Sequence, residues 1–342
     1  MSAPRVSVII SNKNGVQWLP KCFASLRSQT VFDDLEIIVV DNCSADGSAA
    51  LARRELAAFP RATVIENPVD LGYAGGSDVG ADAAQGEFFF ILGNDTWLEP
   101  DCIEQIITAM QTAPADAAIP TVTGYRSNTV VPSPLGFDLT GRPTGVEGDA
   151  ADGSQPGQWP HCFMVAGPGF MFRREVWRKI GGFDAKLFMY AEDDDISWKL
   201  WLAGFQGIQV KNAVLHHRDD TGEIRAATRY LANRNSLIVL AKNAQLLLLL
   251  CLSLQILLLI AEAFFFLIVR RNWKFVWHGY FKAIIDAGKF TPHVLEMRRF
   301  NRRIRRLSDW EMARKFLRFK INRWDMMKAF LSGRLTAARP SA

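Results

Sequence analysis

Short apolar runs alternate with stretches of helical spacing along the first 120 residues of the chain. We expect strands over Val6–Ile10, Glu36–Val40, Thr63–Glu66 and Phe88–Leu92. The first three runs are rich in Val and Ile, which is typical of strands that are covered on both faces. Helical spacing over Trp18–Gln29 and Ser48–Phe59 separates these runs. Alternating strands and helices predict an α/β fold with a largely parallel sheet, flanking helices and right-handed crossovers.

Turn residues interrupt the pattern in the middle of the chain. Residues 121–160 contain 12 Gly or Pro, which predicts a long loop region that could hold a hairpin. A loop of this length is either a functional lid or a variable insertion. Beyond it we expect a helix over Arg173–Ile180, a second over Ile196–Ala203 with Asp195 as its cap, and a strand over Gly207–Leu215.

The composition changes abruptly at Leu246–Val269, an apolar run of 24 residues. Its clearly polar members are Ser253, Gln255 and Glu262. A helix of this length could span a bilayer, whereas a core helix of a protein this size is seldom apolar on all sides. The run therefore favours contact with a membrane over burial in a core.

A second apolar pattern follows this run. Four residues recur at spacings of 3, 4 and 3 with arginines on the opposite face: Met297, Phe300, Ile304 and Leu307. This spacing predicts a basic amphipathic helix that lies on anionic lipid. A nucleic-acid-binding tail would explain the charge alone, but the adjacent apolar run favours lipid, and we expect no nucleic acid partner.

The charge of the chain is unevenly distributed. The net charge is +5, yet residues 270–342 carry 19 Lys or Arg against 5 Asp or Glu. If residues 246–269 crossed the bilayer once from a cytosolic domain, this basic tail would lie outside, against the positive-inside tendency. We therefore expect interfacial or re-entrant insertion through residues 246–269 and the basic tail, which keeps the tail on the cytoplasmic side of the membrane.

The remaining composition sets broad limits. The five cysteines are scattered and form no CxxC pair, so a reducing compartment is favoured over a disulfide framework or a structural zinc site. The first residues lack the features of a secretion signal. We divide the chain into a catalytic domain over residues 1–225 and a helical, basic, membrane-associated region over residues 226–342, and the oligomeric state stays open.

Polar side chains follow the ends of the expected strands. Ser11–Asn14 follow the first strand, Asp41–Ser48 the second, and Gly93, Asn94 and Asp95 the run at Phe88–Leu92. Ligands of parallel sheets bind at the carboxyl ends of the strands, where a carboxylate suits ribose hydroxyls or a Mg²⁺ or Mn²⁺ ion on phosphate oxygens. The alternative is that these segments are only turns and helix caps. A dinucleotide fold is disfavoured, because the first turn holds one glycine where G-x-G-x-x-G is required.

Two further clusters carry candidate chemistry. Asn67–Asp78 contains three glycines before a helix, which is either a phosphate site or only a helix start. The four consecutive acids Glu192–Asp195 repel one another, and crowding of this kind raises some pKa values, as a general base requires. His216 and His217 follow the last expected strand, where an imidazole could complete a metal site.

In their order and spacing these pieces resemble the inverting family 2 glycosyltransferases of the GT-A fold, particularly the bacterial rhamnosyltransferase-like branch. The resemblance covers about residues 5–245. The matching segments are VSVIISNKN, IIVVDNCSADGS, ENPVDLGYAGG, FFFILGNDT, GGFDAKLFMYAEDDDISWKLWLAGF and AVLHH, followed by RYLANRNSLIVLAKN.

The resemblance implies a role for each matching position. Asp193 would be the catalytic base, with Glu192 beside it in the Glu-Asp pair. Asp95, at the last position of the family's D-x-D motif, and His217 would hold Mg²⁺ or Mn²⁺. The residues implied on the donor side are Asn12, Asp41, Gly75, Gly76, Asp78 and Asn94. On the acceptor side, Gly167 and Gly169 resemble the loop that precedes the acceptor site.

One departure from the family pattern matters. Gly93 stands where D-x-D has its first acid, which leaves the strictness of metal dependence open. The resemblance implies a single displacement from a dTDP- or UDP-sugar, with rhamnose suggested by the branch, onto a lipid-linked glycan in cell-surface polysaccharide assembly. One alternative is a sugar nucleotidyltransferase, which would need a basic, Gly-rich loop that Ser11–Gly15 lacks. The other is a catalytically impaired membrane-bound partner that keeps the nucleotide-sugar fold.

Overall fold

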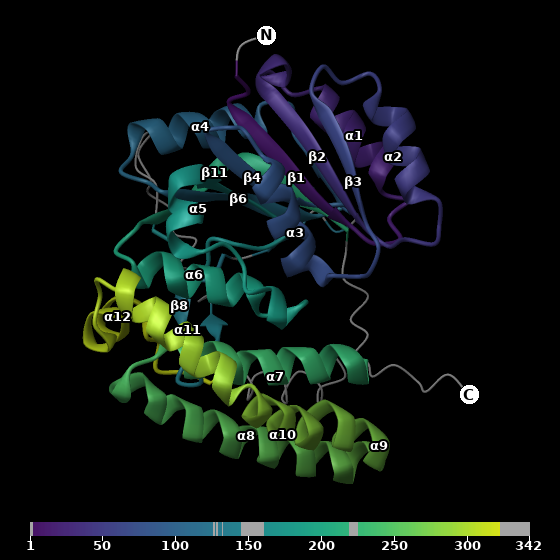
Figure 1. The fold of residues 1–342 in the computed structure, drawn as a ribbon. Helices are drawn as coiled ribbons and strands as arrows, with labels where there is room; N and C mark the ends of the chain where they lie inside the picture. The colour runs from purple at the N-terminus through teal and green to yellow at the C-terminus, as the bar shows by residue number, and fades with distance from the viewer. Residues whose placement is uncertain are drawn as a thin grey trace.

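The computed structural model describes residues 3–125, 127, 129–131, 133–144, 161–218 and 225–321. Within them a central sheet of nine strands has the order β3-β2-β1-β4-β10-β6-β11-β5, with β7 paired to β6 (Figure 1). The strands are β1 Val6–Asn12, β2 Leu35–Asn42, β3 Ala62–Asn67, β4 Phe88–Gly93, β5 Thr96–Leu98, β6 Ala117–Gly124, β7 Val130–Val131, β10 Gly169–Arg173 and β11 Gly207–His217.

The predicted largely parallel sheet is confirmed for β1 to β4 and for the pair formed by β6 and β11, which is parallel as well. Strand β10 is antiparallel to both β4 and β6, and β5 and β7 are antiparallel to their neighbours as well. The sheet is therefore mixed, as in GT-A folds, because the chain re-enters it in the opposite direction after the long segment that follows β6.

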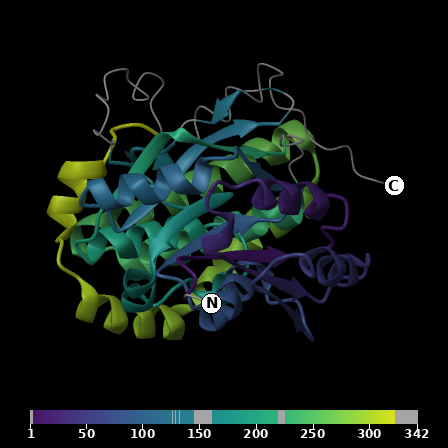
Figure 2. The same ribbon diagram turned by 90° about the horizontal axis from the view of Figure 1, so that it is seen from above.

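Helices cover both faces of the sheet (Figures 1 and 2). One face carries α1 (Leu19–Arg27), α2 (Ser48–Leu56) and α4 (Cys102–Thr112); the other carries α3 (Gly72–Ala83), α5 (Arg174–Ile180) and α6 (Glu192–Leu202). Alternate side chains of one strand enter the two layers: Val8 and Ile10 belong to the first core and Ile9 to the second. The 3₁₀ turns η1 (Phe32–Asp34) and η2 (Ala185–Leu187) complete this part.

The long loop region predicted over residues 121–160 is partly ordered. Strand β6 extends to Gly124, and the expected hairpin corresponds to a two-stranded ribbon of β8 (Gly136–Phe137) and β9 (Pro143–Thr144). Residues 145–160 of the predicted loop lie outside the described residues.

Helix α6 begins four residues earlier than the sequence pattern predicts. Its N-cap is Ala191, so all four acids of the cluster fall in its first turn, where negative charge is favoured by the helix dipole. The prediction of Asp195 as a cap is therefore wrong. Asp195 is fully buried, pairs with Lys242 at 3.0 Å and accepts a hydrogen bond from Asn243.

The region after residue 225 is helical. Its elements are α7 Ala226–Asn243, α8 Leu246–Arg270, α9 Trp273–Val276, the π-helix η3 Trp277–Phe281, α10 Lys282–Lys289, α11 Thr291–Ile304 and α12 Asp309–Phe316. In Figure 1 helices α6, α7 and α8 lie in successive layers below the sheet. Phe163 and Trp198 from the front of the chain share one core with Ile238 of α7 and Phe316 of α12. The boundary at 225/226 stays a prediction, but it does not separate two hydrophobic cores.

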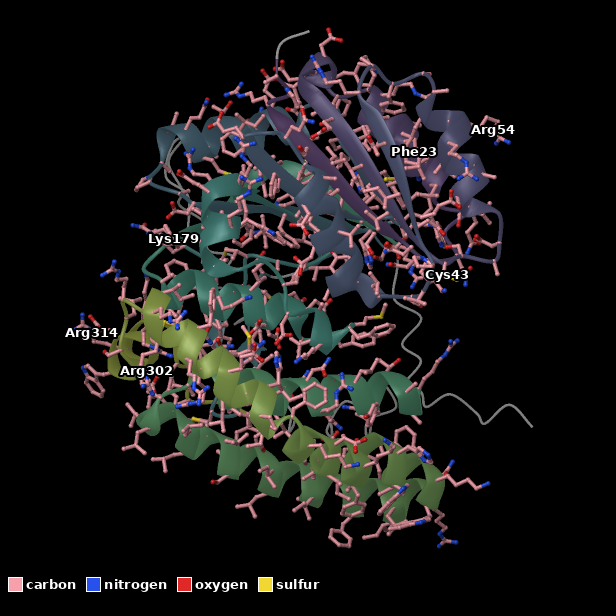
Figure 3. All side chains as sticks on the ribbon, in the orientation of Figure 1. Phe23, Cys43, Arg54, Lys179, Arg302 and Arg314 are labelled. Atoms are coloured by element: carbon pink, nitrogen blue, oxygen red, sulfur yellow. The ribbon has the colours of Figure 1, made fainter. Side chains whose placement is uncertain are left out.

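Helix α11 contradicts the prediction of a helix that lies on lipid. Its apolar side faces the protein: Ile304 packs against the second core of the sheet, and Phe300 lies over Gly181. Arg298 donates to the carbonyls of Ala241 and Ala244 at the end of α7. Other arginines, among them Arg302 in α11 and Arg314 in α12, are exposed (Figure 3). Residues 322–342 of the predicted basic tail lie outside the described residues.

A buried network of ion pairs joins α7 to α6, to the segment before α6 and to α11. The ammonium of Lys242, which is fully buried, contacts the carboxylates of Asp184 and Asp195. His293 of α11 approaches the same Asp184 carboxylate at 2.8 Å. Burial acts to raise the pKa of Asp184, but the adjacent cation of Lys242 holds it well below its usual range. An ion pair this deep is stable only when both partners remain in place.

Candidate active site

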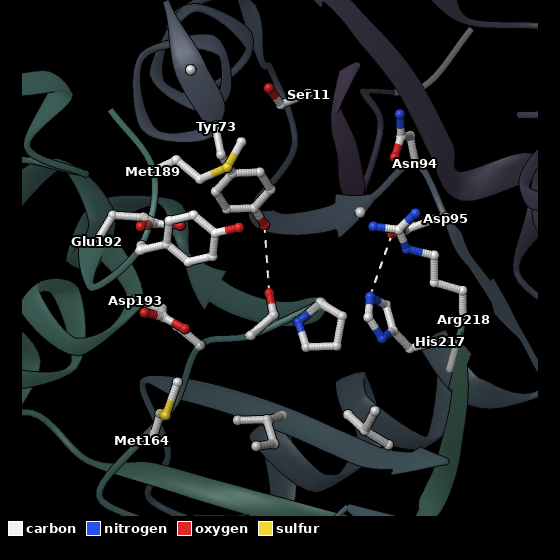
Figure 4. A pocket seen from close by; sticks show the side chains of 18 of the residues that line it. Ser11, Tyr73, Asn94, Asp95, Met164, Met189, Glu192, Asp193, His217 and Arg218 are labelled. Atoms are coloured by element: carbon white, nitrogen blue, oxygen red, sulfur yellow. Dashed lines mark hydrogen bonds and ion pairs between the residues drawn. The ribbon is translucent and has the colours of Figure 1, made fainter. Parts of the chain in front are cut away.

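A cavity of about 660 Å³ opens where the carboxyl ends of β1, β4 and β11 face the start of α6. This volume is typical of sites for small organic ligands. Its walls include residues at the ends of the strands, the first residues of the acidic cluster Glu192–Asp195 and the segment before β10 (Figure 4). The predicted site residues among its lining are Asn94, Asp95, Gly167, Glu192, Asp193 and His217.

One wall carries the charged groups at the ends of β4 and β11. His217 Nε2 lies 3.5 Å from Asp95 Oδ1, and Arg218 Nε lies 2.7 Å from Asp95 Oδ2. Burial acts to raise the pKa of Asp95, but the hydrogen bond and charge of His217, with Arg218, hold it below its ordinary value. Asp95 is therefore ionised at neutral pH. The neighbouring His216 faces away from it and bonds Glu99 and Thr123.

Gly93 explains why this wall has one carboxylate where D-x-D has two. A Cβ at position 93 would meet Asp95 Oδ1 at 3.1 Å and the carbonyl of Pro168 at 3.3 Å. The N–H of Gly93 also donates to that carbonyl at 2.7 Å. A second acid would therefore be crowded against the first, and the exposed guanidinium of Arg218 adds a positive group instead.

A divalent cation fits this wall with an incomplete set of protein ligands. Among the described residues no group of three His, Cys, Asp or Glu side chains is placed to hold a metal. Asp95 and His217 offer one carboxylate oxygen and one imidazole nitrogen. Mg²⁺ and Mn²⁺ commonly take one or two protein ligands and complete their shell with phosphate oxygens and water. The residues present therefore suit a cation that arrives with a diphosphate.

The opposite wall carries the start of α6. Glu192 and Asp193 line the cavity, and the carboxylate of Asp193 accepts from the N–H of Asp194 at 2.9 Å. Burial raises the pKa of Glu192 well above its ordinary value, and the charge of Asp193 adds to the shift. Burial raises the pKa of Asp193 too, although backbone N–H groups oppose it. Burial and Asp193 raise the pKa of Asp194 to about 8. The cluster lowers its repulsion by holding protons on some members, which leaves Asp193 as the best candidate for an ionised base.

Two neighbouring side chains of α7 hold the turn that presents these acids: Asn235, and Arg234, which donates to the carbonyl of Leu187 at 3.3 Å. Phe188, Tyr190 and Ala191 have φ of +69°, +68° and +66°, values that non-glycine residues seldom adopt. The amide of the fully buried Asn235 donates to three carbonyls of this turn, at 2.8 Å to Leu187, 2.9 Å to Met189 and 2.7 Å to Tyr190. The conformation before Glu192 and Asp193 therefore depends on residues of α7.

Two donor-side predictions fall in a buried network behind the cavity. Asn12 donates to Asp41 at 2.7 Å and accepts from Asn94 at 2.7 Å. Both Asn12 and Asp41 are buried, and neither is among the lining residues. Their side chains shape the turns after β1 and β2. Neighbouring residues line the cavity instead: Ser11 and Asn42 at the ends of β1 and β2, Lys13 after β1, and Asn94 after β4.

Of the three glycines in the cluster Asn67–Asp78, Gly72 lines the cavity. Gly75 and Gly76, predicted on the donor side, lie in the buried part of α3 and do not line it. A Cβ at Gly76 would meet Asn42 Nδ2 at 2.4 Å and Ser11 Oγ at 2.5 Å. Gly76 therefore lets α3 pack closely on β1 and β2. Asp78, also in α3, accepts from the N–H of Phe183 at 3.0 Å, so it holds the chain before α6 and has no contact with the cavity.

The two acceptor-side glycines have different surroundings. Gly167 lines the cavity with φ of +151°, and a Cβ there would meet open space. Gly169 does not line it; a Cβ at this position would meet the side chain of Leu215 at 2.2 Å. Gly169 thus permits the pairing of β10 within the sheet.

Three cavity groups were missed by the sequence analysis. Tyr73 stands between the two walls, with its hydroxyl 3.5 Å from the carbonyl of Gly167, and burial raises its pKa well above the ordinary value. Tyr190 and Arg218 line the cavity as well. All three lie in or beside segments that the sequence analysis singled out. The sequence does not show, however, whether a single tyrosine or arginine there points into a cavity.

Comparison with known proteins adds to this geometry. Residues 7–181 match the family model described as Glycosyl transferase family 2. EpsH of Bacillus subtilis, named as a glycosyltransferase, is 36% identical over 107 residues, which cover 31% of this chain and 30% of EpsH. The N-acetylglucosaminyl-diphospho-decaprenol L-rhamnosyltransferase of Mycobacterium tuberculosis is 23% identical over 233 residues, which cover 60% of this chain and 75% of that protein. The chain spans about a third or less of the length of the first curated relatives it matches.

Solved structures resemble the whole described fold. S. aureus TarS 1–349 in complex with UDP-GlcNAc has a TM-score of 0.56 at 13% identity and covers 88% of this chain and 89% of its own. GalNAc-T7 with UDP, GalNAc and Mn²⁺ also has a TM-score of 0.56, at 16% identity, covering 70% of this chain and 48% of its own. At these identities the likeness shows the fold alone, a mixed α/β fold of the GT-A kind.

Proposed function

The chain belongs to glycosyl transferase family 2, and on this premise we propose that it transfers a sugar from a nucleoside-diphosphate donor to a hydroxyl of a lipid-linked glycan. One observation carries the proposal: the cavity holds Asp193 at one wall and Asp95, with His217 and Arg218, at the opposite wall (Figure 4). A base faces a diphosphate-binding group across a space that can hold a sugar.

The proposed reaction is a single displacement. Asp193 takes the proton of the acceptor hydroxyl, whose oxygen forms a bond to the anomeric carbon. The bond from that carbon to the diphosphate oxygen breaks, and its electron pair leaves with the nucleoside diphosphate. Attack from the side opposite the leaving group inverts the anomeric configuration. The raised pKa of Asp193 supports its assignment, because a stronger base accepts the proton more readily.

The wall at Asp95 would receive the donor diphosphate. Asp95 and His217 would hold a Mg²⁺ or Mn²⁺ ion, which when bound offsets charge on the leaving diphosphate. Arg218 would contribute a fixed positive charge to the same oxygens. A uridine diphosphate donor is supported by similar solved structures in complex with UDP-GlcNAc or UDP, and a deoxythymidine diphosphate donor would go with rhamnose as the transferred sugar.

Rhamnose and a lipid-linked acceptor are the narrower parts of the proposal. Their support is the match to the mycobacterial L-rhamnosyltransferase, whose name gives a diphospho-decaprenol acceptor, and a helix apolar enough to meet a membrane. We infer a role in polysaccharide assembly at the cytoplasmic face of the bacterial inner membrane.

The test is release of nucleoside diphosphate from a panel of dTDP- and UDP-sugars, with and without Mn²⁺, followed by transfer to lipid-linked oligosaccharides. Asp193→Asn should lower turnover by about 10²–10⁴-fold, the usual contribution of a general base, and leave nucleotide affinity unchanged. Asp82→Asn, at an exposed position of α3, is the matched control and should have wild-type turnover.

Each alternative function has its own outcome. Unchanged turnover in Asp193→Asn would overturn the base assignment. Nucleotide binding without turnover on any donor would favour the impaired membrane-bound partner. Release of pyrophosphate from a nucleoside triphosphate and a sugar phosphate would favour a nucleotidyltransferase.

A further inference from the structure

The outer face of α8 is a continuous apolar stripe. Its most exposed side chains recur every four or seven residues along the helix: Leu246 (83% exposed), Leu250 (70%), Leu257 (64%), Phe264 (54%) and Ile268 (75%). Side chains on one side of a helix at this spacing form a single surface. In Figures 1 and 3 this helix forms the lower edge of the molecule, with side chains that project away from the fold. So large an exposed apolar face indicates a partner.

Gln255 and Glu262, the two long polar side chains of the apolar run 246–269, face the protein instead. Gln255 is fully buried and donates to Ser236 Oγ of α7 at 2.9 Å. Glu262 is 2% exposed, accepts from the hydroxyl of Tyr280 at 3.0 Å and lies 3.5 Å from Arg229. If α8 left the protein to cross a bilayer, these groups would be separated and a carboxylate would enter lipid, which is costly. The polarity of α8 therefore suits a helix with protein on one side and lipid on the other.

Aromatic side chains extend the apolar stripe beyond the end of α8. Trp273 and Trp277 are 53% and 40% exposed, and their rings lie 5.9 Å apart. Phe281 contacts Trp273 at 5.9 Å and Phe264 of the stripe at 6.2 Å. Tryptophan is enriched where a protein meets the headgroup level of a membrane.

The charge at this end of the surface is positive. Arg271 and Lys274 are exposed beside the two tryptophans. The sequence of α8 and α9 contains one acid, Glu262, and it is buried. Basic side chains at the rim of an apolar face attract anionic lipid headgroups, whereas a second copy of the chain would bring the same positive charge.

We propose that α8 lies in the plane of an anionic membrane surface, with Leu250, Leu257 and Phe264 in the acyl boundary and Trp273 and Trp277 among the headgroups, and that it does not cross the bilayer. This proposal specifies how the membrane attachment in the proposed function is made. It rests on the proposed function only for the identity of the acceptor. Docking itself can be measured without any sugar transfer.

The first test is binding of the full chain to vesicles of phosphatidylcholine with and without phosphatidylglycerol. Binding should need the anionic lipid and weaken with salt. The double variant Leu250→Glu/Leu257→Glu should lower vesicle binding by at least about tenfold, because charge on the apolar face opposes insertion. Its affinity for uridine diphosphate should match wild type, which shows that the fold and the nucleotide site are intact and separates this proposal from the proposed function.

Depth is tested with vesicles that contain brominated lipid, which quenches tryptophan fluorescence. The quenched part of the emission should disappear in Trp273→Phe/Trp277→Phe and persist in Trp310→Phe, a matched control on α12 at an exposed position. Equal quenching in both variants would contradict the assignment of the lipid-facing tryptophans.

Topology is tested with a cysteine introduced at position 246 or 271 in a Cys43→Ser/Cys251→Ser background, whose three remaining cysteines are buried, labelled by a membrane-impermeant maleimide from the side to which protein is added. Both ends should react if α8 lies in the plane, and protection of one end would show a span instead. Two further results would overturn the proposal: absence of vesicle binding by wild type, or a dimer in solution that the Leu250→Glu/Leu257→Glu variant converts to monomer.

Discussion

Substitution of Asn235 is the most direct test of how the site is built, because its amide supports a turn whose backbone conformation is unfavourable by itself. Three residues of the turn, Phe188, Tyr190 and Ala191, have left-handed φ, each at a cost of about 1–3 kcal/mol. Asn235→Ala removes the only side-chain amide that the described residues place on the carbonyls of Leu187, Met189 and Tyr190. The turn should then relax away from the geometry that presents Asp193.

The magnitude follows from the bonds lost. The amide nitrogen has two hydrogens, so its three contacts amount to about two full hydrogen bonds. The carbonyl of Leu187 keeps the N–H of Met189 and the guanidinium of Arg234, so the loss falls on the part-buried carbonyls of Met189 and Tyr190. Each of them left unsatisfied costs about 1–3 kcal/mol, and the two together, partly offset by relaxation, give about 3 kcal/mol. At 1.36 kcal/mol per factor of ten, the native turn becomes about 10²-fold less populated relative to open forms. Turnover should fall, whereas nucleotide affinity, set at the opposite wall, should stay unchanged.

The measurement is hydrogen exchange of the peptide that covers residues 185–195, together with donor turnover. The N–H groups of Leu187 and Phe188 are bonded within this turn, so its opening appears as faster exchange. Asn233→Ala is the matched control: Asn233 is as buried, two residues away on α7, and donates to the carbonyl of Gly279 at 2.8 Å. If both variants lost the same protection in this peptide and the same turnover, general destabilisation would explain the result and the support by Asn235 would be refuted.

Two further substitutions test a charged group of the cavity, Arg218, and a member of the adjacent acidic cluster, Asp194. Arg218→Ala should weaken binding of uridine or deoxythymidine diphosphate by about tenfold to a hundredfold, because a hydrogen bond to a charged group is worth about 1.5–3 kcal/mol; calorimetry in Mn²⁺ and in chelator checks this. Asp194→Asn should flatten the dependence of stability on pH. The pKa of Asp194 is raised to about 8 from about 4 when unfolded, so between these values only the folded state keeps the proton and stability falls as pH rises. The slope is at most about 1.4 kcal/mol per pH unit, and urea unfolding at several pH values measures it.

The sequence predicted the elements of the front half well because their signals are local. The apolar runs of β1, β2 and β4 and the helical spacing of α1 and α2 fall within a few residues of the observed bounds. The direction of β10 could not be predicted in this way, since Gly169–Arg173 reads the same as a parallel or an antiparallel strand. Its partners are set by long-range packing against β4 and β6.

The predictions of site residues show the same difference between local signals and long-range packing. Residues at the ends of strands, such as Asp95 and His217, reached the predicted cavity because the topology brings strand ends together. Gly76 and Asp78 did not, because glycine in a motif serves close helix packing as readily as ligand approach. Asn235 stood in a segment that the resemblance included, but nothing in the sequence shows which carbonyls a buried amide will reach.

The residues after 225 differ in composition from the front of the chain, yet they share a hydrophobic core with it and support the turn before Glu192. Adjacent residues of α7 face opposite ways: Asn235 supports the turn before Glu192, and Ser236 accepts from Gln255 of α8. Asp309 of α12 accepts from the first N–H groups of α8, and Arg305 bonds the carbonyl of Asn243 at the end of α7. A chain cut before α8 would expose the core that Trp198 shares with Phe316 and remove His293 from the ion network around Asp184. Loss of activity on truncation would therefore say nothing about membranes, and the role of α8 has to be judged from substitutions on its outer face, which leave every one of these contacts in place.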